Sequence, residues 1–169
     1  MKKYLPFILL FFLILGCPNS ETSIIPSLSL GNAHDFEGVL VTFVEAFWLE
    51  YDPIYVPLEN AIGIEVRITN NLSHSVNYSI IFPWGALIDN NGNQIDNVMY
   101  FSLVNATTFN GSSILPGATI TDTITFDEYS GSPSSFVFMG EPPIYDDYFD
   151  NLCYPFELAF MVSEVITRP

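Results

Sequence analysis

A strict alternation of apolar and polar residues over Ala61–Asn70 constrains the fold of this chain more than any other feature. The apolar positions are Ile62, Ile64, Val66 and Ile68, and the positions between them hold Gly63, Glu65, Arg67 and Thr69. Successive side chains of a strand point to opposite faces, so this period of two predicts a β-strand with one buried face. Burial of the four apolar side chains is worth roughly 6–12 kcal/mol gross, at about 1.5–3 kcal/mol each.

Further segments alternate in the same way or are bounded by turn residues. The predicted strands, besides 61–70, are 39–49, 75–82, 85–89, 94–98, 118–126 and 156–162. Asn91-Gly92 lies between two of them and accepts positive φ cheaply, which predicts a hairpin at 90–93. Asp122 interrupts the apolar face of 118–126, and we interpret it as lying near a sheet edge or at a bulge. Several short strands separated by turns predict an all-β fold, an antiparallel β-sandwich.

The beginning of the chain has the layout of a secretory signal. Lys2-Lys3 precedes an apolar run over 5–15, and the small residue Gly16 precedes Cys17. A transmembrane helix needs about 20 apolar residues, and this run is much shorter. The pattern therefore predicts a cleaved signal peptide at residues 1–16.

The sequence Ile14-Leu15-Gly16-Cys17 resembles the lipobox of bacterial lipoproteins, although Leu15 is bulkier than usual for that position. The resemblance implies that Cys17 is acylated and anchors the chain to a membrane. Pro18 in place of an aspartate favours the outer membrane or cell surface over the inner membrane. The alternative is a secreted protein in which Cys17 occurs by chance. Residues 17–37, with little periodicity, are predicted to be the lipidated cysteine and a flexible tether.

The charge of the chain restricts its partners. All 19 acidic residues follow Cys17, and the basic residues after it are Arg67 and Arg168, so the processed chain carries about −17 against −15 for the precursor. This field argues against nucleic-acid binding and suits either a soluble domain or one that attracts cations. If Cys17 is acylated, Cys153 has no partner within the chain. We predict a buried thiol there, with a reactive thiol or an intermolecular bridge as the alternatives.

Three motifs in a fixed order resemble a known family. They are the strand 64–69 ending in Asn70-Asn71, the segment 87–94 with its Asp-x-x-Gly hairpin, and Leu115-Pro116-Gly117-Ala118 leading to 123–127. Over about 39–162 the chain resembles the immunoprotective-antigen-like immunoglobulin-fold domain of bacterial lipoproteins, a family of unknown function. The resemblance implies an immunoglobulin-like β-sandwich, which we place at 38–165, with 166–169 as a C-terminal tail. It implies no catalytic residues.

The segment 141–154 is the strongest candidate for a ligand site. Its oxygen-bearing residues, which suit Ca2+, are Glu141, Asp146, Asp147, Asp150 and Asn151. Its aromatic residues, on which a sugar could stack, are Tyr145, Tyr148, Phe149 and Tyr154. The alternative is a solvated acidic loop that its own aromatic residues hold in place.

Features of an enzyme are not evident. His34 falls in the predicted tether and His74 in a turn, and neither a Gly-x-Ser-x-Gly elbow nor a phosphate loop is present. We expect a non-enzymatic, membrane-anchored module for protein interaction or structure, with no cofactor and with an envelope or host protein as partner. A ligand-binding module for Ca2+ or a glycan, using 141–154, is the alternative.

Overall fold

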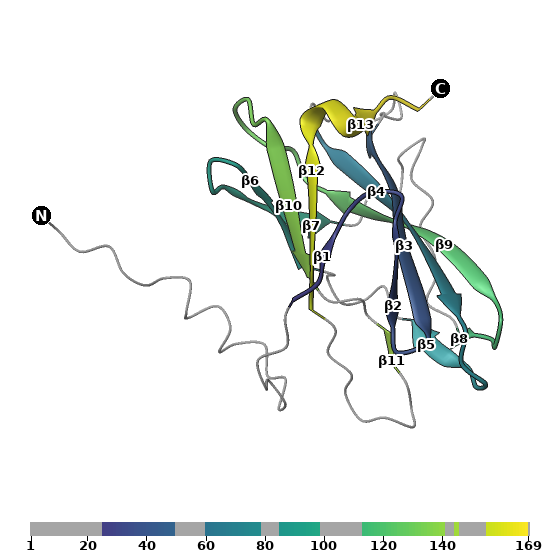
Figure 1. Ribbon diagram of the computed structural model, residues 1–169. Helices are drawn as coiled ribbons and strands as arrows, with labels where there is room; N and C mark the ends of the chain where they lie inside the picture. The colour runs from purple at the N-terminus through teal and green to yellow at the C-terminus, as the bar shows by residue number, and fades with distance from the viewer. Residues whose placement is uncertain are drawn as a thin grey trace, which may run out of the picture.

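The structure is a computed structural model that describes residues 25–49, 60–78, 85–98, 113–140, 144–145 and 155–168 (Figure 1). Within these ranges the only helical element is a 3-10 turn, η1 (Val162–Glu164), and the other regular elements are strands. The strands are β1 (Ser27–Leu28), β2 (Ala33–Phe36), β3 (Val39–Trp48), β4 (Ile62–Asn70), β5 (Val76–Tyr78), β6 (Gly85–Asp89), β7 (Gln94–Val98), β8 (Ser113–Ile114), β9 (Thr119–Phe126), β10 (Ser135–Gly140), β11 (Ile144–Tyr145), β12 (Phe156–Met161) and β13 (Val165–Ile166). The prediction of an all-β fold is confirmed.

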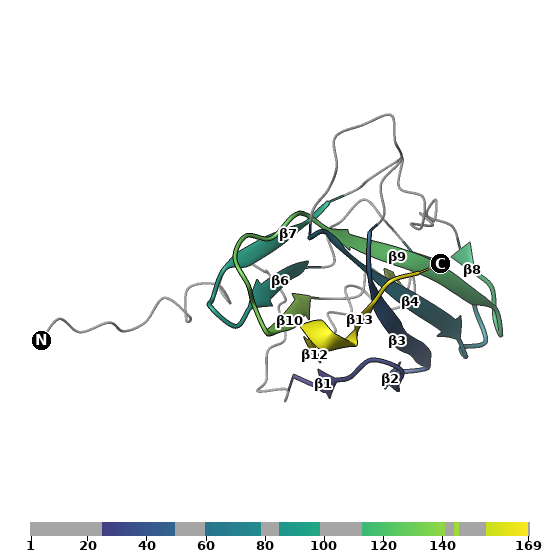
Figure 2. The ribbon, with the colours of Figure 1, turned by 90° about the horizontal axis from the view of Figure 1, so that it is seen from above.

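The strands form two layers that share one hydrogen-bonded path. The order along that path is β1-β12-β10-β6-β7-β9-β4-β3-β13. Off this path, β2 also pairs with β3. β7 pairs with β6 through residues 94–96 and with β9 through Asn97 and Val98, so it passes from one layer to the other. β1 and β2 lie along the opposite side, between β12 and β3 (Figure 2). The result is a β-sandwich with both sides bridged.

The two ends of the sandwich carry different connections. At one end β3 begins, β4 finishes and the three-stranded sheet β11-β5-β8 lies nearby (Figure 1). We refer to it as the small-sheet end. At the other end β3 and β12 finish, and the β6–β7 hairpin and η1 lie there; we refer to it as the hairpin end.

Alternation along the strands builds the core. On β4 the four predicted apolar residues are all buried, while Arg67 is exposed and Glu65 and Thr69 are partly exposed. Aromatic rings fill the space between the layers, and Phe138 of β10 packs edge-on against Phe126 of β9 with ring centroids 5.0 Å apart. The predicted strands from 39 onward agree with the observed ones to within one residue at each described end. β10 was not predicted, because Val137 and Met139 are apolar as well as Phe136 and Phe138, and the segment shows no alternation.

Asp122 lies on β9, opposite Val66 of β4, and is buried. Among the described residues, β7 pairs with β9 at Phe126 and Thr125. The Thr123 N–H donates to Asp122 Oδ1 over 2.7 Å. β9 pairs with β4 in unbroken register from Thr119 to Phe126, so the predicted alternative of a bulge at Asp122 is wrong for this pairing.

The ranges predicted for the tether and for the C-terminal tail are both too long. Within 17–37, residues 27–28 form β1 and residues 33–36 form β2, so the second half of the predicted tether belongs to the sandwich. His34 consequently lies in a strand and not in a tether. At the other end, β13 and Arg168 are fixed to β3, so 166–168 is part of the domain. Segments of two to four residues have no visible period, and their partners on β12 and β3 decide their conformation.

Candidate functional site

The predicted ligand segment meets the described structure at β11. Ile144 pairs with Tyr78, and Tyr145 pairs with Asn77 of β5. Asn77 in turn pairs with Ser113 of β8, whose hydroxyl donates to Asn77 Oδ1 over 2.9 Å. The backbone at 144–145 is thus held in the small sheet. The other predicted ligand residues, with Cys17 and Cys153, lie outside the described residues: Glu141, Asp146, Asp147, Tyr148, Phe149, Asp150, Asn151 and Tyr154.

The hairpin at 90–93 is confirmed, and its Asp89 serves the turn. The backbone N–H groups of Asn91 and Asn93 each donate to Asp89 Oδ1 over 2.8 Å, and Asn93 Nδ2 donates to Asp89 Oδ2 over 2.8 Å. Gly92 has φ 84°, a conformation that costs glycine little. Asn90 Oδ1 accepts from Ser134 N–H and fixes the hairpin to the start of β10. Internal donors occupy the Asp89 carboxylate, which is how a turn uses aspartate.

Asp89 gives the fold a pH-dependent contribution. Burial raises the pKa of Asp89, but hydrogen bonds from Asn93 and Asn91 outweigh it and hold that pKa below the usual 3.8. The contribution to stability is therefore present above the unfolded-state pKa and disappears as pH falls through the folded-state pKa. We expect Asp89→Asn to lower the melting temperature at pH 7 and to flatten the fall in stability below about pH 4. Melts of this variant and of Asp96→Asn, an exposed carboxylate of the same hairpin, measure it. Equal acid profiles for Asp89→Asn and the parent would contradict this role.

Two of the motifs that carry the family resemblance meet at the small-sheet end. Asn70, at the end of β4, is fully buried, and its Nδ2 donates to the carbonyl oxygens of His74 and Ile114, both over 2.8 Å. Asn70 Oδ1 accepts from Leu72 N–H over 2.9 Å. The Gly117 N–H donates to the Asn70 carbonyl oxygen over 2.7 Å. These residues join three chain segments and have a folding role.

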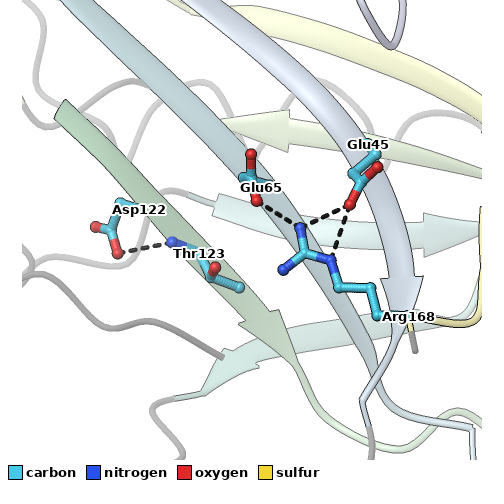
Figure 3. Close-up of polar contacts among 5 residues, drawn as sticks. All are labelled: Glu45, Glu65, Asp122, Thr123 and Arg168. Carbon is cyan, nitrogen blue, oxygen red and sulfur yellow. Dashed lines mark hydrogen bonds and ion pairs between the residues drawn. The ribbon is translucent and has the colours of Figure 1, made fainter. Parts of the chain in front are cut away.

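A cluster that the sequence did not point to lies on the outer face of the layer that contains β3 and β4, near the hairpin end (Figure 3). Glu45 of β3 and Glu65 of β4 stand directly opposite each other. Arg168 bridges them: its Nε and Nη2 both lie 2.8 Å from Glu45 Oε1, and its Nη2 lies 2.6 Å from Glu65 Oε2. Like charges placed opposite each other across two strands repel, and the guanidinium removes that repulsion. The missed signal was that Arg168 is one of two basic residues after Cys17.

Phe47 completes this cluster. The Cζ of Arg168 lies 3.5 Å from the centroid of the Phe47 ring, a cation–π contact. Beneath the ring is Gly63, where a Cβ would come within 2.6 Å of Phe47 Cζ, so the glycine leaves room for the ring. Phe47 is thereby fully buried although it belongs to the outer face. Both glutamates and the arginine are engaged with one another, and the arrangement joins residues 165–168 to β3 and β4.

Replacement of Arg168 by glutamine is expected to lower the free energy of unfolding by about 1–2 kcal/mol, since two partly buried carboxylates lose their counter-ion. Arg168→Lys should lose less, because it keeps the charge but not the forked geometry. Urea unfolding at low and high salt measures this, with the exposed Arg67→Gln as the matched control. A loss no larger than that of Arg67→Gln would show that the cluster contributes nothing.

Other chemistry-bearing residues are dispersed in the described part of the chain. No group of three His, Cys, Asp or Glu side chains there could hold a metal ion. The His34 ring packs against the Phe36 ring, with centroids 4.5 Å apart. His74 lies in the turn after β4, and its carbonyl oxygen accepts a hydrogen bond from Asn70 Nδ2. Among the same residues no helix is long and apolar enough to span a membrane.

Comparisons with known proteins bear on the fold. No family model matches the sequence, and no curated protein matches it. The crystal structure of the YjhA protein from Bacillus subtilis is similar, with TM-score 0.55 and 14% identity over 77% of this chain and 96% of that one. The secreted protein MPT63 from Mycobacterium tuberculosis has TM-score 0.48 and 12% identity over 83% and 99% of the two chains. An uncharacterized β-sandwich protein from Clostridium difficile has TM-score 0.48 and 15% identity over 86% and 99%. At this identity, the likeness to YjhA concerns the fold alone.

Proposed function

We propose that this chain is a membrane-anchored extracytoplasmic lipoprotein whose β-sandwich is a non-enzymatic module for protein interaction or structure. The observation that carries the proposal is the lipobox-like Ile14-Leu15-Gly16-Cys17 behind a short apolar leader, nine residues before the first described contact of the domain at Pro26. Several acyl chains at about 0.8 kcal/mol per buried CH2 hold a domain stably at a membrane, where one chain is marginal.

The polar residues of the described domain support a module. Asn70, Asp89 and Arg168 each make several side-chain hydrogen bonds or ion pairs, and each of them joins strands or closes a turn. Their hydrogen-bonding groups are directed at other parts of the fold. The strongly acidic composition suits a partner protein whose contact surface is positively charged.

The Cys17→Ser variant tests the anchor. We expect the parent to fractionate with membranes and to carry a diacylglyceryl mass on Cys17, and the variant to move to the soluble fraction because it cannot be acylated. Cys153→Ser is the matched control and should stay with the membranes. Mass spectrometry of the processed N-terminus together with fractionation gives the result. An unmodified Cys17 in the processed parent would refute the lipoprotein.

Cross-linking in intact cells tests the partner. Cross-links between an envelope or host protein and the parent, which weaken as salt screens the acidic domain, are expected. Repeated recovery of the chain without any cross-linked protein would count against an interaction module and leave a structural one.

A second candidate function is a ligand site for Ca2+ or a glycan in the segment 141–154. The observation in its favour is that β11 holds Ile144–Tyr145 against β5, which supports this segment on the folded domain. Millimolar Ca2+ should then raise the melting temperature of the parent and not of a variant combining Asp146→Asn with Asp147→Asn. Equal melting temperatures of the parent with Ca2+ and with chelator would remove the metal version.

A further inference from the structure

The tip of the β6–β7 hairpin presents an asparagine followed by a glycine. Asn91 and Gly92 are both exposed, and a Cβ at Gly92 would meet no described atom within 4 Å apart from its chain neighbours. The backbone nitrogen of the residue after an asparagine can attack the side-chain amide carbon and close a five-membered imide ring. A side chain on that next residue crowds the attack, and glycine has none. The pair is therefore open both to this ring closure and to water.

The other asparagines of the described residues lack this combination. Each of them precedes a residue that carries a side chain: Asn32, Asn60, Asn70, Asn71, Asn77, Asn90, Asn93 and Asn97. Two of them are also held in place, since Asn70 is fully buried and Asn93 Nδ2 donates to Asp89 Oδ2 over 2.8 Å. The Asn91 amide is held less closely, with its Nδ2 3.5 Å from Asp89 Oδ2. In the described domain Asn91 is thus the asparagine most open to the reaction.

The folded hairpin restrains the attacking nitrogen. The Gly92 N–H donates to the Asp89 carbonyl oxygen over 2.9 Å, and the Asn91 N–H donates to Asp89 Oδ1 over 2.8 Å. The Gly92 nitrogen must give up its hydrogen bond and its proton before it can attack, so the turn has to open first. An exposed turn opens locally at less cost than the whole domain unfolds. The reaction is therefore slower than in the unfolded chain but does not require unfolding of the sandwich.

We propose that Asn91 is a site of spontaneous deamidation, and that the modification weakens the β6–β7 hairpin. The Gly92 nitrogen forms a bond to Asn91 Cγ, the Cγ–Nδ2 bond breaks, and ammonia leaves with the proton that the Gly92 nitrogen had carried. One water molecule then opens the imide at either of its two carbonyl groups. The product at position 91 is an aspartate or an isoaspartate, and each adds one negative charge. Water is the only other reactant, so the age of the protein sets the extent of the change.

Asp89 connects the modification to the stability of the hairpin. In the aspartate product, a carboxylate replaces the amide whose Nδ2 lies 3.5 Å from Asp89 Oδ2, so two like charges face each other. In the isoaspartate product, an extra methylene enters the main chain and displaces the N–H groups of Gly92 and Asn93, which donate to Asp89. Asn90 Oδ1 accepts from Ser134 N–H, so a loosened hairpin also loosens the start of β10.

Mass spectrometry of the aged full chain tests the site. A second Asn-Gly pair, at 110–111, lies outside the described residues, so the parent for this experiment carries Asn110→Gln. After incubation at mildly alkaline pH, peptide mapping should find the mass gain of deamidation at Asn91 before any other described asparagine. Asn91→Gln is the control and should show no gain at that position, because its longer side chain closes the ring far more slowly. A first modification at another described asparagine would overturn the proposal.

The restraint by the fold is tested on the same chain. Unfolding in urea should raise the rate at Asn91 by about tenfold or more, because the turn is then always open. Asp89→Ala should raise the rate in the folded protein by at least about threefold, since it removes hydrogen bonds that close the turn. Asp96→Ala, at an exposed carboxylate of the same hairpin, is the matched control and should leave the rate unchanged. Equal rates in the folded and unfolded chains would show that the turn does not restrain the reaction. An unmodified Asn91 in the folded chain would show that it is no site.

The melting temperature tests the consequence. Anion exchange separates the modified chain from the unmodified chain by its added charge, and the modified fraction should melt about 2–6 °C lower. In the Asp89→Ala background the same modification should lower the melting temperature by less, because the opposing carboxylate is gone. Equal melting temperatures of the two fractions of the parent would overturn the effect on the hairpin. An equal loss with and without Asp89 would overturn the role of that carboxylate.

Discussion

Replacement of Phe138 by alanine is expected to lower the free energy of unfolding by about 4 kcal/mol, because a large buried ring leaves a cavity that the two layers cannot close. Phe138 is fully buried on β10. Its ring centroid lies 5.0 Å from that of Phe126, 5.1 Å from that of Phe156 and 6.0 Å from that of Phe43. Phe43 and Phe126 belong to the opposite layer, so one side chain joins both halves of the core, and edge-on ring contacts add to the area that it buries.

Urea unfolding followed by tryptophan fluorescence or circular dichroism measures this loss. Phe138→Leu should cost less than half as much, since it keeps most of the apolar volume. Met139→Ala, one residue further along β10 and directed away from the core, is the control and should cost about 1 kcal/mol or less. A Phe138→Ala variant as stable as Met139→Ala would show that the layers are not held together at this ring cluster.

Asn70→Ala is the second substitution with a large expected effect, a loss of about 3–5 kcal/mol. Asn70 is fully buried, and its amide satisfies the carbonyl oxygens of His74 and Ile114 and the N–H of Leu72. Alanine would leave these three backbone groups without their partner, at about 1–3 kcal/mol for each group that stays buried. Leucine is expected to be no better, because it restores volume but none of the hydrogen bonds.

Asn71→Ala is the matched control for Asn70. Asn71 is the next residue and is exposed, and its backbone N–H, which donates to the Gly38 carbonyl oxygen, survives the change. We expect a loss within about 0.5 kcal/mol, as for surface substitutions in general. Equilibrium unfolding of the two variants under identical conditions gives the comparison. Losses of similar size at 70 and 71 would mean that the buried amide is not what stabilises this end of the sandwich.

Sequence reasoning predicted the long strands well and the short ones poorly. β4, β9 and β12 carry a period of two over six or more residues, so the local sequence of each strand predicts which face is buried. The β6–β7 hairpin follows from Asn91-Gly92, where local backbone chemistry decides the turn. β1, β2 and β13 contain two to four residues each, too few for a period, and they become strands only because β12 and β3 offer free edges.

The polar residues show the same division. The resemblance picked out Asn70, Asp89 and Gly117, and the structure explains them as turn and junction residues. No pattern could connect Arg168 with Glu45 and Glu65, since 123 and 103 residues separate it from these partners. Composition alone points to the segment 141–154. Within it the structure describes β11, which pairs with β5.

By itself the sequence determined that this protein is all-β, which faces of its longer strands are buried, where its main hairpin turns, and that it is acidic. These properties depend on residues near one another along the chain, whose period and backbone preferences act before any tertiary contact forms. Only the tertiary structure decided the order of the strands, the bridging of both sides by β7 and β1–β2, the Arg168 cluster and the contact through which Pro26 joins β12. These depend on which distant segments meet, and the free energy that selects the meeting comes from burial and hydrogen bonding across the whole domain.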